Sequence, residues 1–228
     1  MGNTVAATER RPRASHAGNP APATAATTAL RELALFDFDH TLTDRDSYAR
    51  FLRRVATPER RAQAWWRVGP WLLAYRLKLI SAERIRRRVT MQVLRDRHLD
   101  DIATQAQAYA RDDLPAMLRP DMMEQLRWHK AQGHTVAIVS ASLDLYLRPW
   151  CEQLGLELIC NTLETDGNRL TGRYAGGDIG RHKAARIRSR YDLAGFHRIH
   201  AYGDSAEDKP MLALAHVRWW RGKPVAQR

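Results

Sequence analysis

Short runs of apolar residues, each followed by polar side chains, are the dominant pattern in this chain of 228 residues. An apolar run of about five residues, bounded by polar or glycine positions, indicates a strand that is buried on both faces. The expected strands are residues 33–36, 134–140, 157–160 and 199–203. Segments with helical spacing lie between them, near residues 143–154 and 180–191. Strands that alternate with helices predict an α/β fold, with helices wrapping a parallel sheet.

Helical periodicity extends through the long interval between the first two strands. Apolar positions recur three or four residues apart there, as they do along one face of a helix. We therefore expect an all-helical cap over residues 44–120, inserted into a core of residues 30–43 and 121–228. A hairpin is expected within that core at residues 163–174. The three clearest helical sets are Tyr48, Phe51, Leu52 and Val55; Ile85, Val89 and Val93; and Ile102, Ala106 and Tyr109.

Residues 1–29 differ in composition from the rest of the chain. They are rich in Ala, Thr and Pro and contain Arg10, Arg11 and Arg13, but they have no apolar segment. A secretory signal needs such a segment, so these residues do not fit one. We interpret them as a disordered tail. A presequence of the mitochondrial type is the alternative, because the tail is basic and nearly free of acidic residues.

Two carboxylates follow the first strand at a spacing of two. Alternate residues of a strand project to the same side, so Asp37 and Asp39 begin on one side of its carboxyl end. Two close carboxylates repel each other unless a cation or a proton lies between them. The arrangement indicates a site for a hard cation such as Mg²⁺, or a carboxylate nucleophile beside an acid/base. Aspartate and threonine after a strand also cap helices and form turns, so this segment alone does not decide the function.

Three later segments supply matching chemistry. Asp204 and Asp208 follow the strand that ends at Gly203, and they offer further metal ligands. Ser140 ends another strand, where its hydroxyl is placed to hold a phosphate oxygen, and Lys183 offers a cation from an expected helix. The carboxyl ends of parallel strands meet at one edge of a sheet, which is where such sheets bind ligands. The sequence therefore predicts a phosphate and metal site at this edge.

In their order along the chain, four segments resemble the motifs of the haloacid dehalogenase (HAD) superfamily. They are Asp-x-Asp-x-Thr at 37–41, the strand that ends at Ser140, Lys183, and Gly-Asp-x-x-x-Asp at 203–208. Details such as Val139-Ser140-Ala141-Ser142 are most similar to subfamily IB, the phosphoserine-phosphatase-like branch. The resemblance covers residues 33 to 220 and implies a Rossmann-like sheet, with a helical cap that closes over the site and selects the substrate.

The resemblance also implies a role for each residue of the site. Asp37 would attack the phosphorus and form an aspartyl-phosphate, and Asp39 would act first as general acid and then as general base. Mg²⁺ would be held by Asp37, by the backbone carbonyl of Asp39 and by Asp204, with Asp208 close by. Thr41 would orient the loop after the strand. The phosphate contacts would be Thr41, Ser140, Ala141 and Lys183.

Several functions remain open at this point. A Mg²⁺-dependent phosphomonoesterase acting on a small, phosphoserine-like metabolite is the first expectation. A lipid phosphatase acting on a head group such as phosphatidylglycerophosphate is the alternative. A phosphotransferase would use the same aspartyl-phosphate but pass it to an acceptor other than water. A nucleic-acid-binding module would account for the formal net charge of +12 but would leave the four motifs unexplained.

The expected cap is basic and rich in tryptophan. It contains seventeen Lys or Arg residues against nine Asp or Glu, which indicates an anionic partner or a solvated helix surface. Trp65, Trp66 and Trp71 lie among Arg67, Arg76 and Lys78. Such a mixture suits peripheral contact with an anionic membrane, although the cations argue against a spanning helix. Packing inside the cap is the other use of these tryptophans.

The two cysteines bear on the compartment. Cys151 and Cys160 do not form a Cys-x-x-Cys pair, which argues against a zinc site or a redox pair. We expect both thiols to be reduced, as they are in cytoplasmic proteins. The expected location is therefore the cytoplasm, with the inner face of the membrane as a further hypothesis. The oligomeric state is not predicted by any of these patterns.

Overall fold

The computed structural model describes residue 1 and residues 30–225. Its central feature is a six-stranded sheet in the order β3-β2-β1-β6-β7-β8. Neighbouring strands are parallel, except that β8 runs antiparallel to β7. The strands are β1 (Glu32–Phe36), β2 (Thr135–Leu143), β3 (Glu157–Asn161), β6 (Arg198–Gly203), β7 (Val217–Trp220) and β8 (Lys223–Val225). The predicted fold class, an α/β protein with a Rossmann-like and mostly parallel sheet, is confirmed.

Helices cover both faces of this sheet. They are α5 (Pro120–Ala131), α6 (Asp144–Leu154), α7 (Lys183–Arg190) and α8 (Lys209–Leu212). Because side chains alternate along a strand, Ala34 and Phe36 of β1 pack in a core with α5 and α6. Leu33 and Leu35 pack in a second core with α7 and α8. β1 is thus buried on both faces, which is why its sequence is apolar without alternation.

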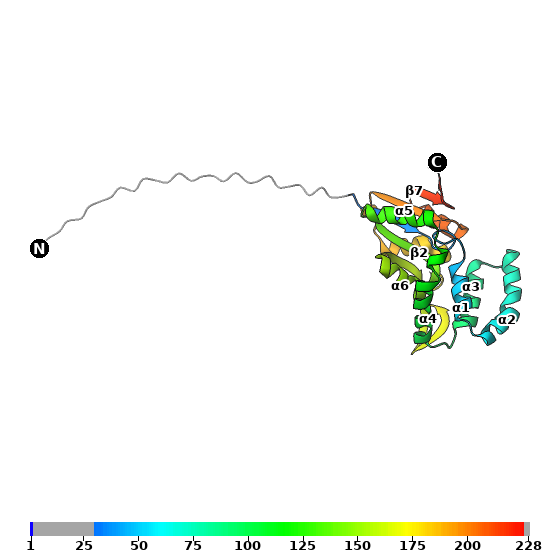
Figure 1. Ribbon diagram of the computed structural model, residues 1–228. Helices are drawn as coiled ribbons and strands as arrows, with labels where there is room; N and C mark the ends of the chain where they lie inside the picture. Colours follow the sequence, from blue (N-terminus) through cyan, green and yellow to red (C-terminus); the bar gives the residue numbers. More distant parts are fainter. Residues whose placement is uncertain (2–29, 226–228) are drawn as a thin grey trace.

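Four further α-helices and one short 3-10 helix (Pro115–Met117) lie between β1 and α5, and α2 is at the outer edge of the molecule (Figure 1). The α-helices are α1 (Ser47–Val55), α2 (Pro58–Arg76), α3 (Ala82–Leu94) and α4 (Leu99–Asp112). The first three begin after Asp46, Thr57 and Ser81, whose side chains each accept a hydrogen bond from the N–H three residues on. Apolar positions that predicted these helices, such as Phe51 and Ile102, are fully buried.

Helices α1 and α4 pack directly on the core. The rings of Phe51 in α1, Tyr109 in α4 and Tyr146 in α6 have centroids 4.9, 5.3 and 5.4 Å apart. The Tyr109 hydroxyl donates a hydrogen bond to the Ser47 carbonyl over 2.8 Å, and the hydroxyls of Ser47 and Tyr146 lie 3.0 Å apart. These contacts fix the N-terminal end of α1 relative to the sheet.

The hairpin predicted at residues 163–174 is present as β4 (Leu163–Asp166) and β5 (Arg169–Tyr174). It forms a separate two-stranded sheet and bonds to the connection between α3 and α4. The Asp96 N–H donates to the Leu170 carbonyl over 2.8 Å, and the Leu170 N–H donates to the Arg97 carbonyl over 2.9 Å. These contacts attach the hairpin to the helical insert, although it follows the insert in sequence. The division into a core of residues 30–43 and 121–228 and a cap of residues 44–120 stays a prediction.

The tryptophan-rich segment forms the second half of α2 and the turn that follows it. Trp66 is 75% exposed. Trp71 instead packs within the insert, with the Arg88 guanidinium 3.9 Å from its ring centroid. The side chain of Trp65 and residues 2–29 of the tail predicted at residues 1–29 lie outside the described residues. Among residues 30–225, no helix combines the length and the apolar character needed to cross a membrane.

Candidate active site

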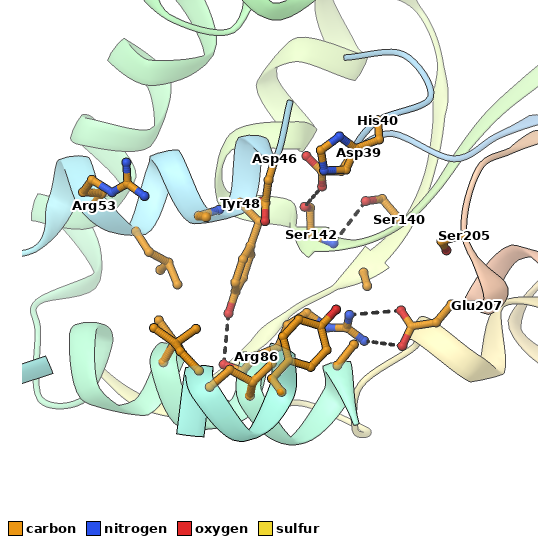
Figure 2. A pocket seen from close by; sticks show the side chains of 18 of the residues that line it. Asp39, His40, Asp46, Tyr48, Arg53, Arg86, Ser140, Ser142, Ser205 and Glu207 are labelled. Atoms are coloured by element: carbon orange, nitrogen blue, oxygen red, sulfur yellow. Dashed lines mark hydrogen bonds and ion pairs between the residues drawn. The ribbon is translucent and has the colours of Figure 1, made fainter. Parts of the chain in front are cut away.

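The predicted site residues gather near the carboxyl ends of β1, β2 and β6. Figure 2 shows two of them, Asp39 and Ser140, beside one cavity. Asp37 directly follows β1, and its N–H donates to the Tyr202 carbonyl of β6 over 2.9 Å. Ser140 lies in β2, and Asp204 follows β6. Because these neighbouring strands are parallel, segments far apart in the sequence end side by side at this edge of the sheet.

A buried lysine joins two of the carboxylates. Lys183 begins α7, and its Nζ lies 2.5 Å from Asp37 Oδ1 and 2.6 Å from Asp208 Oδ1. Burial alone would lower the pKa of Lys183, but the two carboxylates outweigh this effect and raise it. Burial raises the pKa of Asp37, against the opposing effect of Lys183. A lysine held here offsets negative charge on Asp37 and on a phosphoryl group beside it.

Asp208 organises the turn after β6. Its Oδ2 accepts hydrogen bonds from the Ser205 N–H over 2.9 Å, from the Ser205 hydroxyl over 2.8 Å and from the Asp204 N–H over 3.2 Å. Gly203 permits this close approach, because a Cβ there would lie 2.6 Å from the Cβ of Asp208. Asp208 is fully buried and does not line the cavity described below. It therefore holds Asp204 and Lys183 in place from the side away from the cavity.

The carboxylates of Asp37, Asp204 and Asp208 form a group suited to a hard cation. One oxygen from each lies within 4.8 Å of the others. The Thr41 hydroxyl is 3.1 Å from Asp37 Oδ2 and 3.5 Å from Asp204 Oδ1. Burial and the charge of Asp208 raise the pKa of Asp204. An all-oxygen donor set with more negative charge than Lys183 alone can offset fits Mg²⁺.

The Asp39 carboxylate is held apart from this group. Its Oδ2 accepts a hydrogen bond from the Ser142 hydroxyl over 2.5 Å, and its Oδ1 accepts one from the Ser47 N–H over 2.6 Å. Burial raises the pKa of Asp39, and these two donors act in the opposite direction. Ser47 begins α1, so the helix N-terminus also faces this carboxylate. The two aspartates two residues apart thus occupy different environments and can take different roles.

The expected phosphate contacts do not all face the cavity. Ser140 and Ala141 do line it. The Ser140 hydroxyl accepts from the Ser142 N–H over 3.1 Å, and the Ala141 carbonyl accepts from the Asn161 side chain over 2.7 Å. Thr41 is only 4% exposed and is not part of the lining. Its hydroxyl donates to Asp37 Oδ2, which fits a role in positioning that carboxylate, and its expected contact with a phosphate stays a prediction.

A cavity of about 760 Å³ opens above these residues. Asp37, Asp39, Ser140, Lys183 and Asp204 line its polar end, which we call the floor. The remaining wall comes mainly from α1, α2 and α3 and carries many apolar side chains. Representative residues of this apolar wall are Leu52, Ala56, Leu72, Ile85, Val89 and Val93. The helical insert therefore forms most of the space into which a bound molecule would extend.

Arg86 is a residue of the site that the sequence did not single out. It extends from α3 to Glu207 beside the β6 turn (Figure 2), with Nη1 and Oε2 3.0 Å apart. Its Nε also lies 2.8 Å from Asp178 Oδ2. Its side chain is 15% exposed, and those of Asp178 and Glu207 are 1% and 18% exposed. A largely buried ion pair thus links the helical insert to the core at the rim of the cavity.

Comparison with known proteins agrees with this geometry. A family model described as haloacid dehalogenase-like hydrolase matches residues 34–213. Protein CicA of Caulobacter vibrioides (strain NA1000 / CB15N) is 33% identical over 199 residues, which cover 85% of this chain and 88% of that protein. A crystal structure of a Bordetella pertussis Tohama I protein with unknown function has a TM-score of 0.73 at 27% identity, covering 83% of this chain and 89% of that one.

A structure titled as a phospho-aspartyl intermediate analogue of phosphoserine phosphatase is also similar. Its TM-score is 0.60 at 22% identity, and the match covers 83% of this chain and 85% of that one. At this identity the likeness concerns the fold. The family match spans most of the chain and includes every motif residue at the carboxyl edge of the sheet. The chain therefore belongs to the haloacid dehalogenase-like hydrolase family and is an enzyme of that family.

Proposed function

We propose that this enzyme is a Mg²⁺-dependent phosphomonoesterase that works through an aspartyl-phosphate. The observation that carries the proposal is the placement of Lys183 between Asp37 and Asp208, with Asp39 held separately by Ser142. One carboxylate is thereby placed beside a fixed cation, where a phosphoryl group would be stabilised. The other is free of that cation and available for proton transfer.

In the first step a carboxylate oxygen of Asp37 attacks the phosphorus. A bond forms between Asp37 and phosphorus while the bond from phosphorus to the leaving oxygen breaks. Asp39 donates its proton to that leaving oxygen, and burial, which raises the pKa of Asp39, favours the protonated form that this step needs. Lys183 and Ser140 line the same cavity and stabilise the phosphoryl oxygens.

In the second step water replaces the alcohol. Asp39, now ionised, accepts a proton from the water as it attacks phosphorus, and the bond between Asp37 and phosphorus breaks. Inorganic phosphate leaves, and both aspartates return to their starting states. Ser142 and the Ser47 N–H hold the Asp39 carboxylate in one orientation throughout. A phosphotransferase would follow the same first step and then use an alcohol in place of water.

Mg²⁺ fits the oxygen group described above. Asp37 and Asp204 would hold it with their carboxylates, Asp39 would add its backbone carbonyl, and Asp208 would support Asp204 from behind. When bound, the ion supplies positive charge that reduces the repulsion between a phosphate and the attacking carboxylate. Lys183 remains the only cation among the described residues that contacts Asp37 through a hydrogen bond.

The sequence suggests two substrate classes, and the lining of the cavity helps to choose between them. A small phosphorylated metabolite of the phosphoserine type is the first. A lipid phosphate, met at the inner face of an anionic membrane, is the second. The apolar wall from α1, α2 and α3 favours the second class, because a compact polar leaving group gains little from contact with leucine and valine side chains. A cytoplasmic location is proposed in either case.

Phosphate release from a panel of phosphorylated metabolites and lipids, with and without Mg²⁺, tests the proposed reaction. Mass spectrometry of a rapidly quenched reaction should find the phosphoryl group on the peptide that contains Asp37. Phosphate release without labelling of that peptide would contradict the aspartyl-phosphate route. Transfer to added alcohols at the expense of inorganic phosphate would identify a phosphotransferase.

A further inference from the structure

The apolar wall of the cavity exceeds what phosphoryl transfer requires. Leu52 of α1 and Ile85, Val89 and Val93 of α3 line it together with Leu72 of α2. These side chains line the same cavity as the carboxylates and the lysine of the floor. A group bonded to a phosphate at the floor would extend into the space that they line, and apolar atoms of that group would be removed from water there.

Two charged residues of the cavity lining, Arg86 and Asp46, are already engaged. Arg86 is bound by Asp178 and Glu207. Asp46 caps α1 and accepts a hydrogen bond from the Ala49 N–H over 2.7 Å. A zwitterionic leaving group such as serine would have to compete with these contacts. An alkyl or acyl chain would not, since its gain comes from leaving water.

Helix α2 has a second apolar side that faces away from the cavity. Trp66 and Leu73 of α2 and Leu77, the residue that caps its C-terminus, are spaced by seven and four residues, which places them on one side of the helix. They are 75%, 59% and 61% exposed; we call them the outer stripe. A surface helix normally turns a polar side to water. Here the inner side, with Leu72 and Tyr75, lines the cavity, and the outer side is apolar as well.

We infer that the substrate is an amphiphilic phosphomonoester taken from a lipid bilayer. The apolar part of its leaving group lies against the apolar wall, and the outer stripe of α2 rests on the bilayer. A bilayer suits this stripe because it offers apolar area, and an anionic one also attracts the exposed cations Arg67, Arg76 and Lys78. The cavity volume of about 760 Å³ is in the range of small-molecule sites. This inference rests on the proposed phosphomonoesterase function.

Soluble alkyl phosphates test the cavity without a membrane. The ratio kcat/KM for butyl, hexyl and octyl phosphate should rise by roughly two- to fourfold per added methylene group. Phosphoserine and glycerol phosphate should be poorer substrates than hexyl phosphate. A value of kcat/KM that does not change with chain length, or a preference for phosphoserine, would overturn the inference while leaving the proposed function intact. Absence of phosphate release from every phosphomonoester would instead overturn the proposed function.

A matched pair of leucine variants locates the effect. Leu72→Gln places a polar group on the cavity wall, and it should lower kcat/KM for octyl phosphate about tenfold while changing butyl phosphate little. Leu79→Gln makes the same change at a residue that is 71% exposed and lies in neither the cavity lining nor the outer stripe. It should leave both values unchanged. Equal behaviour of the two variants would contradict the assignment of the apolar wall.

Vesicles test the source of the substrate. Wild type should co-sediment with phosphatidylglycerol vesicles at low salt and less with neutral phosphatidylcholine vesicles. The double variant Leu73→Gln/Leu77→Gln should bind at least about threefold less, and should hydrolyse a long-chain lipid phosphate more slowly in vesicles than in detergent micelles. Wild type remaining in the supernatant, or a double variant that binds as well as wild type, would contradict the bilayer as the source.

Discussion

The Ser142 hydroxyl donates a hydrogen bond to Asp39 Oδ2 over 2.5 Å, from a strand 103 residues further along the chain. This contact and the Ser47 N–H hold the proposed acid/base away from Lys183, which binds Asp37. The two aspartates of one short motif are therefore separated by contacts from β2, α1 and α7. The proposed roles of Asp37 as nucleophile and Asp39 as acid/base depend on these contacts.

Ser142→Ala should reduce acid catalysis while leaving the nucleophile in place. We expect kcat/KM for an alkyl phosphate, whose leaving oxygen needs a proton, to fall roughly 10- to 100-fold. The value for 4-nitrophenyl phosphate should fall much less, because nitrophenolate leaves without one. Ser189→Ala, at an exposed serine of α7, serves as the control. An equal loss with both substrates would show that Ser142 does not act through Asp39.

Asp37→Asn should abolish turnover and keep the fold, because it removes the nucleophile and one metal ligand while preserving side-chain shape. Activity should fall below about 1% of wild type, as it does when a nucleophile is replaced in other enzymes. Circular dichroism and thermal unfolding check the fold. Activity above a few per cent in a folded variant would rule out the aspartyl-phosphate route.

Removal of the metal should stop the reaction. EDTA should abolish activity and added Mg²⁺ should restore it, while beryllium fluoride should inhibit as a mimic of the phosphoryl group on Asp37. Asp204→Ala should raise the Mg²⁺ concentration needed for half-maximal activity by at least about tenfold, with thermal stability unchanged. Asp208→Ala should lower thermal stability as well, because its carboxylate closes the turn and contacts Lys183. Full activity after exhaustive chelation would contradict the site.

Arg86→Met should loosen the insert from the core. The change leaves two largely buried carboxylates without their cation, and we expect the free energy of unfolding to fall by on the order of 3 kcal/mol. Arg87→Met is a close control, since that side chain is 67% exposed and lies 3.8 Å from Glu83 on the same helix. Urea denaturation of both variants measures the difference. Similar losses would show that the contact at the cavity rim contributes little.

A buried histidine predicts how stability depends on pH. Burial and the neighbouring His200 and His134 lower the pKa of His129 to about 3, compared with about 6.5 in an unfolded chain. Between these values only the unfolded state binds the proton. This contribution to stability is therefore complete above pH 6.5 and is lost as the pH falls, by up to about 1.4 kcal/mol per unit.

Urea denaturation at pH 7 and pH 5 measures this dependence. Wild type should lose stability between the two, and His129→Gln should lose less over the same interval. His182→Gln, at an exposed histidine, should behave as wild type. An identical loss in the His129 variant would assign the pH dependence to other groups.

The sequence by itself determined four strands of the main sheet and the position of the carboxylates, because both are local properties. It did not predict β7 and β8 at the edge of that sheet, or the extension of β2 to Leu143. β1 and β6 are short apolar segments buried on both faces, so their composition alone marks them. A residue that follows a strand lies at its end, so Asp37 and Asp204 could be placed at the carboxyl edge before the fold was known. The helices of the insert were equally local, since capping residues such as Ser81 lie next to the segments they start.

Only the tertiary structure decided which distant groups meet these residues. Arg86 is one of four arginines between residues 84 and 88, and helical periodicity does not show which of them points at a carboxylate that lies 92 or 121 residues away. The sequence does not show which group the Ser142 hydroxyl meets, and it is the position of β2 that places this hydroxyl beside Asp39. The apolar wall of the cavity also depends on tertiary structure. Leucine and valine at helical spacing show that a helix has an apolar side, but not whether that side meets the protein core or a cavity. In this chain the packing of α1, α2 and α3 leaves that side facing the cavity above the carboxylates.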